Sequence, residues 1–154
     1  MSYDWHQYWV YAKNLLTHGS NPADAEAIDE ETIRRVAVGR AYYAFYNLIL
    51  EALPNHNLKS MREYYRNTQQ GKGPRFGNHR LLKWFLENGP NVTPDNFDDY
   101  HNFSRELGKL YQQRVHADYK SHYFTNADRL IALQSALLIE KQLPGLFTSQ
   151  PDKN

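Results

Sequence analysis

The chain has 154 residues and a net charge of +1, with 41% hydrophobic and 23% charged residues, which is the composition of one globular domain and excludes a disordered chain. No apolar run approaches the roughly 20 residues of a membrane helix, and the first residues lack the basic and apolar blocks of a signal peptide. Because cysteine is absent, disulfides and thiolate metal sites are excluded as well, and we expect a cytoplasmic protein without metal, cofactor or membrane partner.

Two helices are predicted in the first third of the chain. Apolar residues recur at three- and four-residue steps over 3–18, which predicts a helix that stops at Gly19. A longer helix is expected over 30–53, because Pro54 disfavours helix at the residue before it. Its central residues 40–50 are apolar nearly all round, so we expect it in the middle of a bundle or at a dimer interface. The expected buried face of the first helix consists of Trp5, Tyr8, Trp9, Ala12, Leu15 and Leu16.

The middle of the chain is predicted to be less regular. Residues 58–67 have a helical pattern, whereas 69–77 contain three glycines and a proline and are expected to form a loop. A short helix is expected over 79–86, closed by the Asn-Gly-Pro sequence that follows it.

Two further helices are predicted in the C-terminal half. Thr93 as N-cap, followed by Pro94 and acidic residues, indicates the start of a helix that runs to about Tyr119. The last helix is expected to begin at Thr125 as N-cap and to end before Pro144. Its inward-facing residues are expected to be Leu130, Leu133, Leu137 and Leu138.

The predicted elements define the fold class. No segment alternates with the period of two that a half-buried strand requires, so no sheet is expected. We predict an all-α fold, an up-and-down antiparallel bundle of four to five helices. One domain is expected over 1–147, with a flexible tail over 148–154.

A basic segment lies between residues 55 and 83. It contains seven lysines and arginines against a single acidic residue, Glu63, and aromatic residues stand among them. Basic and aromatic side chains together suit single-stranded RNA, through phosphate contacts and base stacking. The alternative is a solvated surface whose rings anchor the loop to the bundle. The residues expected to contact phosphate or bases are Arg62, Arg66, Lys72, Arg75, Tyr64 and Tyr65.

Charged residues continue the apolar stripes of two predicted helices. Arg114 and Asp118 do so in the helix that ends near 119, and Arg40 does so in the long helix before it. Since buried charges are costly unless paired, we expect these three side chains to meet. They would form either a structural salt-bridge network or a polar pocket in which the arginines hold a phosphate. In the second interpretation His116 or Tyr119 transfers protons.

Three segments resemble the HEPN family in kind and order. They are Arg-Ala-Tyr-Tyr-Ala-Phe-Tyr-Asn at 40–47, Asn-His-Arg-Leu-Leu-Lys-Trp-Phe-Leu-Glu-Asn-Gly at 78–89, and Leu-Tyr-Gln-Gln-Arg-Val-His-Ala-Asp-Tyr at 110–119. More closely, they are similar to a bacterial branch with an arginine, tyrosine-tyrosine helix and a late Arg-x-x-Ala-Asp-Tyr signature, and the resemblance covers about 33–143. It implies a five-helix bundle, a homodimer across the long helices, and a setting in phage defence, RNA processing or toxin–antitoxin pairs with small nucleotidyltransferases.

The resemblance also implies a chemistry for the site. HEPN ribonucleases cleave RNA without metal, with an arginine that stabilises the phosphate charge and a histidine four to six residues later that moves a proton. Arg114 is the counterpart of that arginine, but Tyr119 and Lys120 stand five and six residues after it. His116 is only two residues away, about 200° round a helix. The site residues implied as catalytic are therefore Arg114, His116, Asp118 and Tyr119, without the histidine in its usual place.

Three functions follow from these residues. The first is a metal-independent endoribonuclease or RNA-binding effector, which the basic segment favours. The second is a non-catalytic dimeric module that pairs with a nucleotidyltransferase or another effector, which the displaced histidine favours. A third is a small nucleotide pocket at Arg40 and Arg114. The remaining histidines stand alone in the sequence and are expected to be surface or capping residues: His6, His18, His56, His79 and His101.

Overall fold

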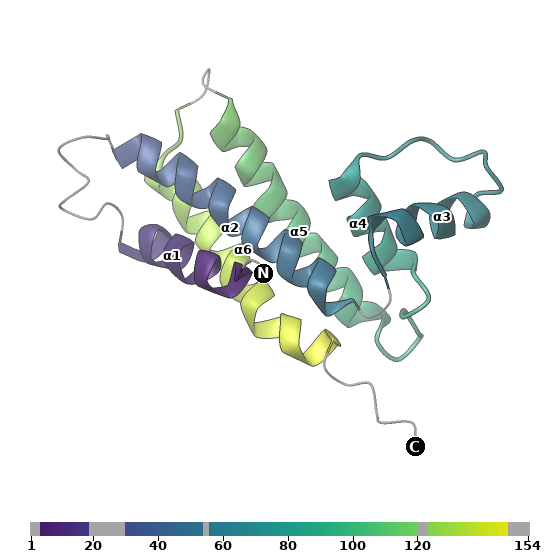
Figure 1. Cartoon of the computed structure of the whole chain (residues 1–154). Coiled ribbons are helices and arrows are strands. Elements are labelled where there is room, and N and C mark those ends of the chain that lie inside the picture. Colours follow the sequence, from purple (N-terminus) through teal and green to yellow (C-terminus); the bar gives the residue numbers. More distant parts are fainter. Residues whose placement is uncertain (1–3, 19–29, 54–55, 120–122, 148–154) are drawn as a thin grey trace.

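The computed structural model describes residues 4–18, 30–53, 56–119 and 123–147 (Figure 1). Over these ranges it contains helices and no strand, which confirms the all-α class. Residues 148–154, Ser2, Gly19, Pro54, Lys120 and His122 lie outside the described residues. The helices are α1 (Trp5–His18), α2 (Glu30–Ala52), α3 (Leu58–Thr68), α4 (Asn78–Asn88), α5 (Phe97–Asp118) and α6 (Asn126–Phe147).

Four of these helices form the bundle, and two lie beside it. Helix α2 packs against α1, α5 and α6, and α6 also contacts α1 and α5 (Figure 1). Helices α3 and α4 form a helical hairpin in which α3 packs on α4, and α4 packs on α5. The long helix α2 is therefore in the middle of the bundle, as its apolar centre predicts, and the two short helices are additional to the bundle.

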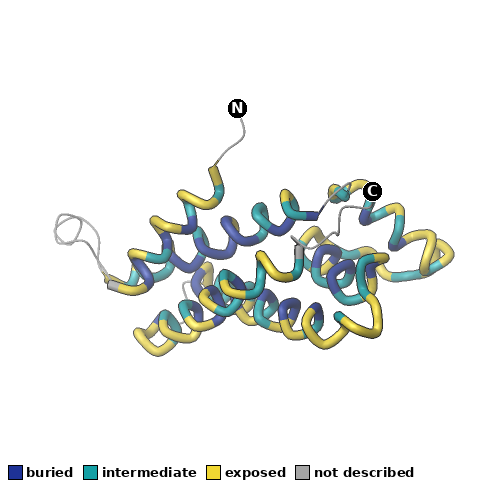
Figure 2. Tube along the Cα trace, turned by 90° about the horizontal axis from the view of Figure 1, so that it is seen from below, coloured by how far each residue is buried: buried dark blue, intermediate teal, exposed yellow. Residues whose placement is uncertain are grey.

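The core is built on the small residues of α2. Ala37, Ala41 and Ala44 are fully buried, and small side chains there allow neighbouring helices to approach closely. Phe45 fills the space beside them, with its ring centroid 4.5 Å from that of Trp9 on α1. Figure 2 shows the buried residues along the facing sides of the helices. The α1 face predicted from spacing is confirmed: Trp9, Ala12, Leu15 and Leu16 are buried, and Trp5 and Tyr8 are half-buried.

Helix α6 differs from the prediction in its buried face. Leu130 and Leu137, expected to face inward, are 49% and 39% exposed. The buried positions are instead Ala132, Ser135, Ala136 and Ile139. The inward face of α6 is thus made mostly of small residues, which suit close helix packing, and the larger leucines are displaced toward its edges.

Side-chain hydrogen bonds explain where α6 begins and how its last turn is held. Thr125 is the predicted cap: its backbone N–H donates to Asp128 Oδ2 (2.9 Å), and the N–H of Asp128 donates to Thr125 Oγ1 (3.2 Å). The predicted stop before Pro144 is wrong, because the helix continues to Phe147. Because Pro144 lies in the last turn, it removes one backbone donor and crowds one carbonyl near the end of the helix. The Tyr100 hydroxyl donates to the carbonyl of Leu146 (3.3 Å), which holds this turn to α5.

Helix α5 begins three residues later than predicted, at Phe97. Thr93 is not its N-cap, because the residues after it form a separate turn. Asn96 holds that turn: its Oδ1 accepts from the N–H of Thr93 (2.7 Å), and its Nδ2 donates to the carbonyl of Asn91 (2.9 Å). The first helical bond then runs from the N–H of Tyr100 to the carbonyl of Asn96 (3.0 Å).

The C-terminus of α5 is held by an arginine of α2. Arg35 Nη1 donates to the carbonyls of Ala117 (2.6 Å) and Tyr119 (3.1 Å), which have no partner within the helix. Glu31 Oε1 accepts from Arg35 Nη2 (2.7 Å) and from the backbone N–H of Phe124 (3.0 Å). One ion pair therefore fixes the end of α5, where Arg114 lies, and the start of the segment that leads into α6.

No helix of the described ranges is both long and apolar enough to cross a membrane.

Candidate functional site

Arg114 lies in the last turns of α5 with its side chain partly exposed. Its Nη2 donates to the Tyr43 hydroxyl (2.7 Å), and its guanidinium carbon is 4.5 Å from the centroid of that ring. The guanidinium also lies 5.3 Å from the Tyr42 ring centroid. Its Nε is 3.5 Å from Asp118 Oδ2, so the predicted pair forms. Two aromatic rings and one carboxylate therefore hold the arginine and leave part of it accessible.

His79 of α4 lies beside this arginine, although the two are far apart in the sequence. Its Nδ1 is 2.6 Å from the Tyr42 hydroxyl. Its ring stacks on Tyr111, with centroids 3.6 Å apart and an interplanar angle of 9°. Three helices thus meet here: α2 supplies Tyr42, α4 supplies His79, and α5 supplies Tyr111 and Arg114.

The start of α4 is fixed by α3. Arg62 donates through Nη1 to the carbonyl of Phe76 (3.0 Å) and through Nη2 to Asn78 Oδ1 (3.1 Å). Gly77 occupies the N-cap position, and His79 is the second residue of the helix. Arg62 is therefore a structural support that positions His79.

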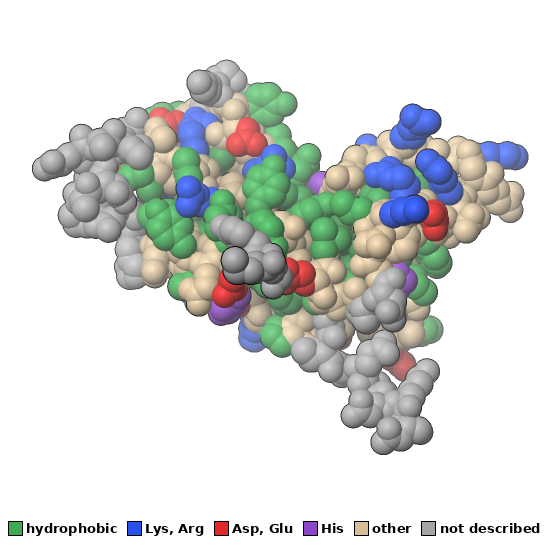
Figure 3. All heavy atoms as spheres, in the orientation of Figure 1, with side chains coloured by type: hydrophobic (Ala, Val, Ile, Leu, Met, Phe, Trp, Pro, Cys, Tyr) green, Lys and Arg blue, Asp and Glu red, His purple; other side chains and the backbone are tan. Residues whose placement is uncertain are grey.

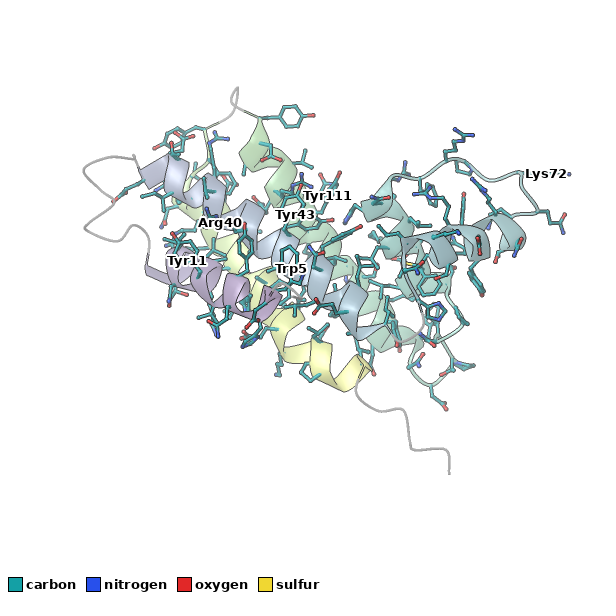
Figure 4. The ribbon with its side chains drawn as sticks, in the orientation of Figure 1. Trp5, Tyr11, Arg40, Tyr43, Lys72 and Tyr111 are labelled. Carbon is teal, nitrogen blue, oxygen red and sulfur yellow. The ribbon has the colours of Figure 1, made fainter. Side chains whose placement is uncertain are left out.

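A cavity of about 340 Å³ opens between the bundle and the helical hairpin. Figure 3 shows a hollow between these two parts of the surface, and Figure 4 shows Tyr43 and Tyr111 on the side of the bundle near α4. Two guanidinium groups line the cavity and no carboxylate does so among the described residues, which favours an anionic ligand. The lining residues are Tyr42, Tyr43, Tyr46, Gly77, Asn78, His79, Arg80, Tyr111 and Arg114.

Burial sets the protonation states of His79 and Tyr42. Desolvation, helped by the nearby charges of Lys83 and Arg114, lowers the pKa of His79 to about 4. Desolvation also raises the pKa of Tyr42 well above its ordinary value. Near neutral pH the cavity therefore contains a neutral imidazole hydrogen-bonded to a protonated phenol, beside a permanently charged arginine.

This low pKa makes the stability of the protein depend on pH. His79 is neutral in the folded chain but titrates near 6.5 when unfolded, so its contribution is fully present above pH 6.5 and is lost as pH falls toward 4. Allowing for its partial exposure, we expect the free energy of unfolding to fall by about 1–3 kcal/mol over this range. Urea unfolding of wild type and of the His79→Gln control at several pH values measures this fall. If the free energy of unfolding changes with pH in the same way for both proteins, the lowered pKa of His79 is contradicted.

The other residues predicted to be catalytic lie elsewhere. His116 faces α6: its Nε2 is 3.6 Å from Asp128 Oδ2, and its ring is 5.5 Å from that of Phe124. The Tyr119 side chain is 60% exposed. The Asp118 side chain is also 60% exposed, so the prediction that it faces the core is wrong. The structure therefore does not bring His116 or Tyr119 into the cavity that Arg114 lines.

The predicted meeting of Arg40 with Arg114 is also wrong. The guanidinium of Arg40 lies over the rings of Tyr8 (5.6 Å) and Tyr11 (5.2 Å) on α1. Figure 4 shows Arg40 beside Tyr11, away from Tyr111. A partly exposed arginine on aromatic faces keeps its charge hydrated, so it needs no buried carboxylate as a partner.

The aromatic rings of the basic segment anchor the 69–77 loop. Tyr65 is buried; its hydroxyl donates to the carbonyl of Pro74 (2.7 Å), and its ring lies 4.8 Å from that of Phe76. Tyr64 packs on Trp84 and Phe85, with centroids 6.0 and 5.7 Å apart. The anchoring interpretation is thereby supported for Tyr65, whereas Tyr64 packs on α4. The prediction that Tyr65 stacks on bases is wrong because its ring is covered.

The charged residues of this segment remain on the surface. Figure 3 shows lysines and arginines gathered over α3 and the loop that follows it. A groove of about 460 Å³ passes between Arg62, Arg66 and Arg75. We call Arg66, Lys72, Arg75 and Arg80 the basic surface; all four are exposed. Arg80 also lines the cavity beside Arg114, so the basic surface adjoins it.

The described ranges contain no group of three or more histidine, aspartate or glutamate side chains arranged to hold a metal ion. Comparisons of the chain with protein-family models, with curated proteins and with solved structures give no match.

Proposed function

We propose that this protein is a metal-independent endoribonuclease of the HEPN type that acts on single-stranded RNA. The observation that carries the proposal is the position of Arg114 in a cavity with a second arginine and a neutral histidine. A guanidinium binds the non-bridging oxygens of a phosphodiester through paired N–H donors. The resemblance of the 110–119 segment to HEPN proteins supports the same role for Arg114, in a bacterial defence or toxin–antitoxin setting.

The chemistry of the cavity suits RNA more than DNA. Cleavage without a metal requires a nucleophile within the substrate, and the 2′-hydroxyl of RNA is adjacent to the phosphorus that it attacks. The protein then has to stabilise the added negative charge and to relay protons. Arg114, held by the Tyr43 hydroxyl, meets the first need, because its donors are already oriented before substrate binds.

The test is a cleavage assay with a chelator present. Labelled single-stranded RNA and a copy with 2′-deoxyribose at every position are incubated with the purified protein in EDTA. The proposal predicts cleavage of the RNA alone, leaving 2′,3′-cyclic phosphate and 5′-hydroxyl ends. Cleavage of the 2′-deoxy strand, or activity that EDTA abolishes, would contradict it.

A dimeric partner-binding module is a second candidate, favoured by exposed apolar groups on α1 and α2. Val36 and Tyr43 of α2 are 43% and 44% exposed, and Tyr11 of α1 is 48% exposed. Such residues suit a homodimer through these helices or a nucleotidyltransferase partner. Light scattering of the purified chain tests the dimer, and Val36→Glu should shift the mass toward the monomer if this surface is the interface.

RNA binding should depend on the basic surface. Arg66→Ala and Arg75→Ala are each expected to weaken binding of a non-cleavable 2′-deoxy strand about equally across sequences. Each should lower the salt slope of log Kd by about 0.7–1, the share of one phosphate contact. Fluorescence anisotropy at several salt concentrations measures this, with Arg105→Ala as a matched control on α5. Slopes that equal the wild-type slope would exclude the surface from binding.

A further inference from the structure

We propose that His79 of α4 is the proton-transfer residue of this site, in place of a histidine on the helix that carries Arg114. The inference rests on the proposed ribonuclease function and adds the group that this function requires. Its basis is geometric: His79 and Arg114 line one cavity, whereas His116 lies against Asp128 of α6.

The surroundings of His79 orient its ring. The Tyr42 hydroxyl is 2.6 Å from Nδ1, and Tyr111 stacks on the face of the ring at 3.6 Å. The proposal requires the neutral tautomer in which Nδ1–H donates to the Tyr42 oxygen, so that Nε2 carries the lone pair and is left for a substrate. A histidine whose second nitrogen is bound to a fixed partner is the arrangement by which proteins set its tautomer and direction.

The reaction balances with these groups. The 2′-oxygen forms a bond to phosphorus as its proton passes to Nε2 of His79. The bond from phosphorus to the 5′-oxygen breaks, and that oxygen leaves with a proton from water. Nδ1–H of the resulting imidazolium donates to the Tyr42 hydroxyl oxygen, and Arg114 faces the charge on the non-bridging oxygens. The hydroxide formed from that water takes the proton from Nε2, which restores the neutral ring.

The charges around His79 keep its ring unprotonated when no substrate is bound. The groups facing it are Tyr42 of α2, Lys83 on its own helix, and Tyr111 and Arg114 of α5. Both cations and burial disfavour the imidazolium in the empty cavity, which keeps the base unprotonated. A bound phosphodiester brings a negative charge to Arg114 and opposes this effect, so the basicity of His79 rises when substrate is present.

The test compares single-turnover cleavage by wild type, His79→Ala, His79→Gln and Tyr42→Phe in EDTA. We expect about a 10²–10⁴-fold loss in both His79 variants, with unchanged affinity for the 2′-deoxy strand. Added imidazole should restore activity to His79→Ala but not to His79→Gln, whose side chain fills the space. Tyr42→Phe, which removes only the orienting hydroxyl, should lose less cleavage activity than the His79 variants. His101→Gln, a histidine of α5 outside the cavity, should cleave as wild type does.

The outcomes separate this inference from the function on which it rests. If wild type cleaves RNA and Arg114→Ala does not, but the His79 variants keep full activity, the inference is wrong and the proposed function stands. The rates are also measured as a function of pH. The inference fails if folded His79→Ala is inactive, imidazole does not restore its activity, and the rate of His79→Gln still falls at low pH as the wild-type rate does. If wild type cleaves no RNA, both fail together.

Discussion

Arg114→Ala is expected to abolish most RNA cleavage, with a loss of about 10²–10³-fold in kcat. The reason is that the guanidinium supplies oriented donors to the charge that develops on the phosphate, and removal of one such donor from a prepared site costs about 3–4 kcal/mol of transition-state stabilisation. Arg114 is held by Tyr43 and Asp118 at 2.7 and 3.5 Å, so its donors do not have to reorganise when substrate binds. Single-turnover cleavage in EDTA measures the effect.

Two variants control for charge and for position. Arg114→Lys keeps the charge but loses the paired donors, so an intermediate rate is expected. Arg40→Ala removes an arginine that packs on Tyr8 and Tyr11 of α1 and should leave cleavage close to wild type. Equal losses of cleavage rate in Arg40→Ala and Arg114→Ala would instead support the sequence-based expectation that the two arginines share one phosphate pocket. Full activity in Arg114→Ala would remove this residue from the mechanism.

Arg35→Ala is expected to lower the free energy of unfolding by about 2–4 kcal/mol. The change leaves the carbonyls of Ala117 and Tyr119 and the carboxylate of Glu31 without the charged donor that they share. Hydrogen bonds to charged groups contribute about 1.5–3 kcal/mol each, and a polar group left unsatisfied costs a similar amount. Urea unfolding followed by circular dichroism measures the loss.

The pair with Glu31 supplies the control for this prediction. Glu31→Ala and the double variant complete a cycle in which the two single losses should not add, because they remove one network. Arg105→Ala, an exposed arginine of α5, should change stability by less than about 0.5 kcal/mol. A loss for Arg35→Ala no larger than that of Arg105→Ala would show that the end of α5 is held by other contacts.

Much of the fold follows from local patterns. Apolar spacing predicts α1 and α2 within two residues, and the glycines of 69–77 predict the loop. Errors occur where individual side-chain hydrogen bonds decide where a helix begins or ends. Asn96 ties up the residues that would have started α5, and a contact from Tyr100 to Leu146 carries α6 past a proline. Neither side-chain contact can be derived from the spacing of residues along one helix.

The sequence predicts Arg114 as a site residue but not His79. Arg114 stands out because a charge continues an apolar stripe, and its pairing with Asp118 follows from helical spacing. His79 carries no such signal: it is one of several isolated histidines, and its role depends on how α4 packs against α5. The weak indication that existed is its place in the 78–89 segment, the second of the three that resemble HEPN proteins.

The most direct test of the central claim is nuclear magnetic resonance of the His79 imidazole during titration with a non-cleavable 2′-deoxy oligonucleotide. If the phosphate binds between Arg114 and His79, the imidazole signals of His79 should shift saturably in wild type, and the pKa of His79 should rise from about 4. Arg114→Ala should lose most of this shift. Saturable binding that leaves the His79 signals unchanged, or that perturbs them equally in Arg114→Ala, would contradict the claim.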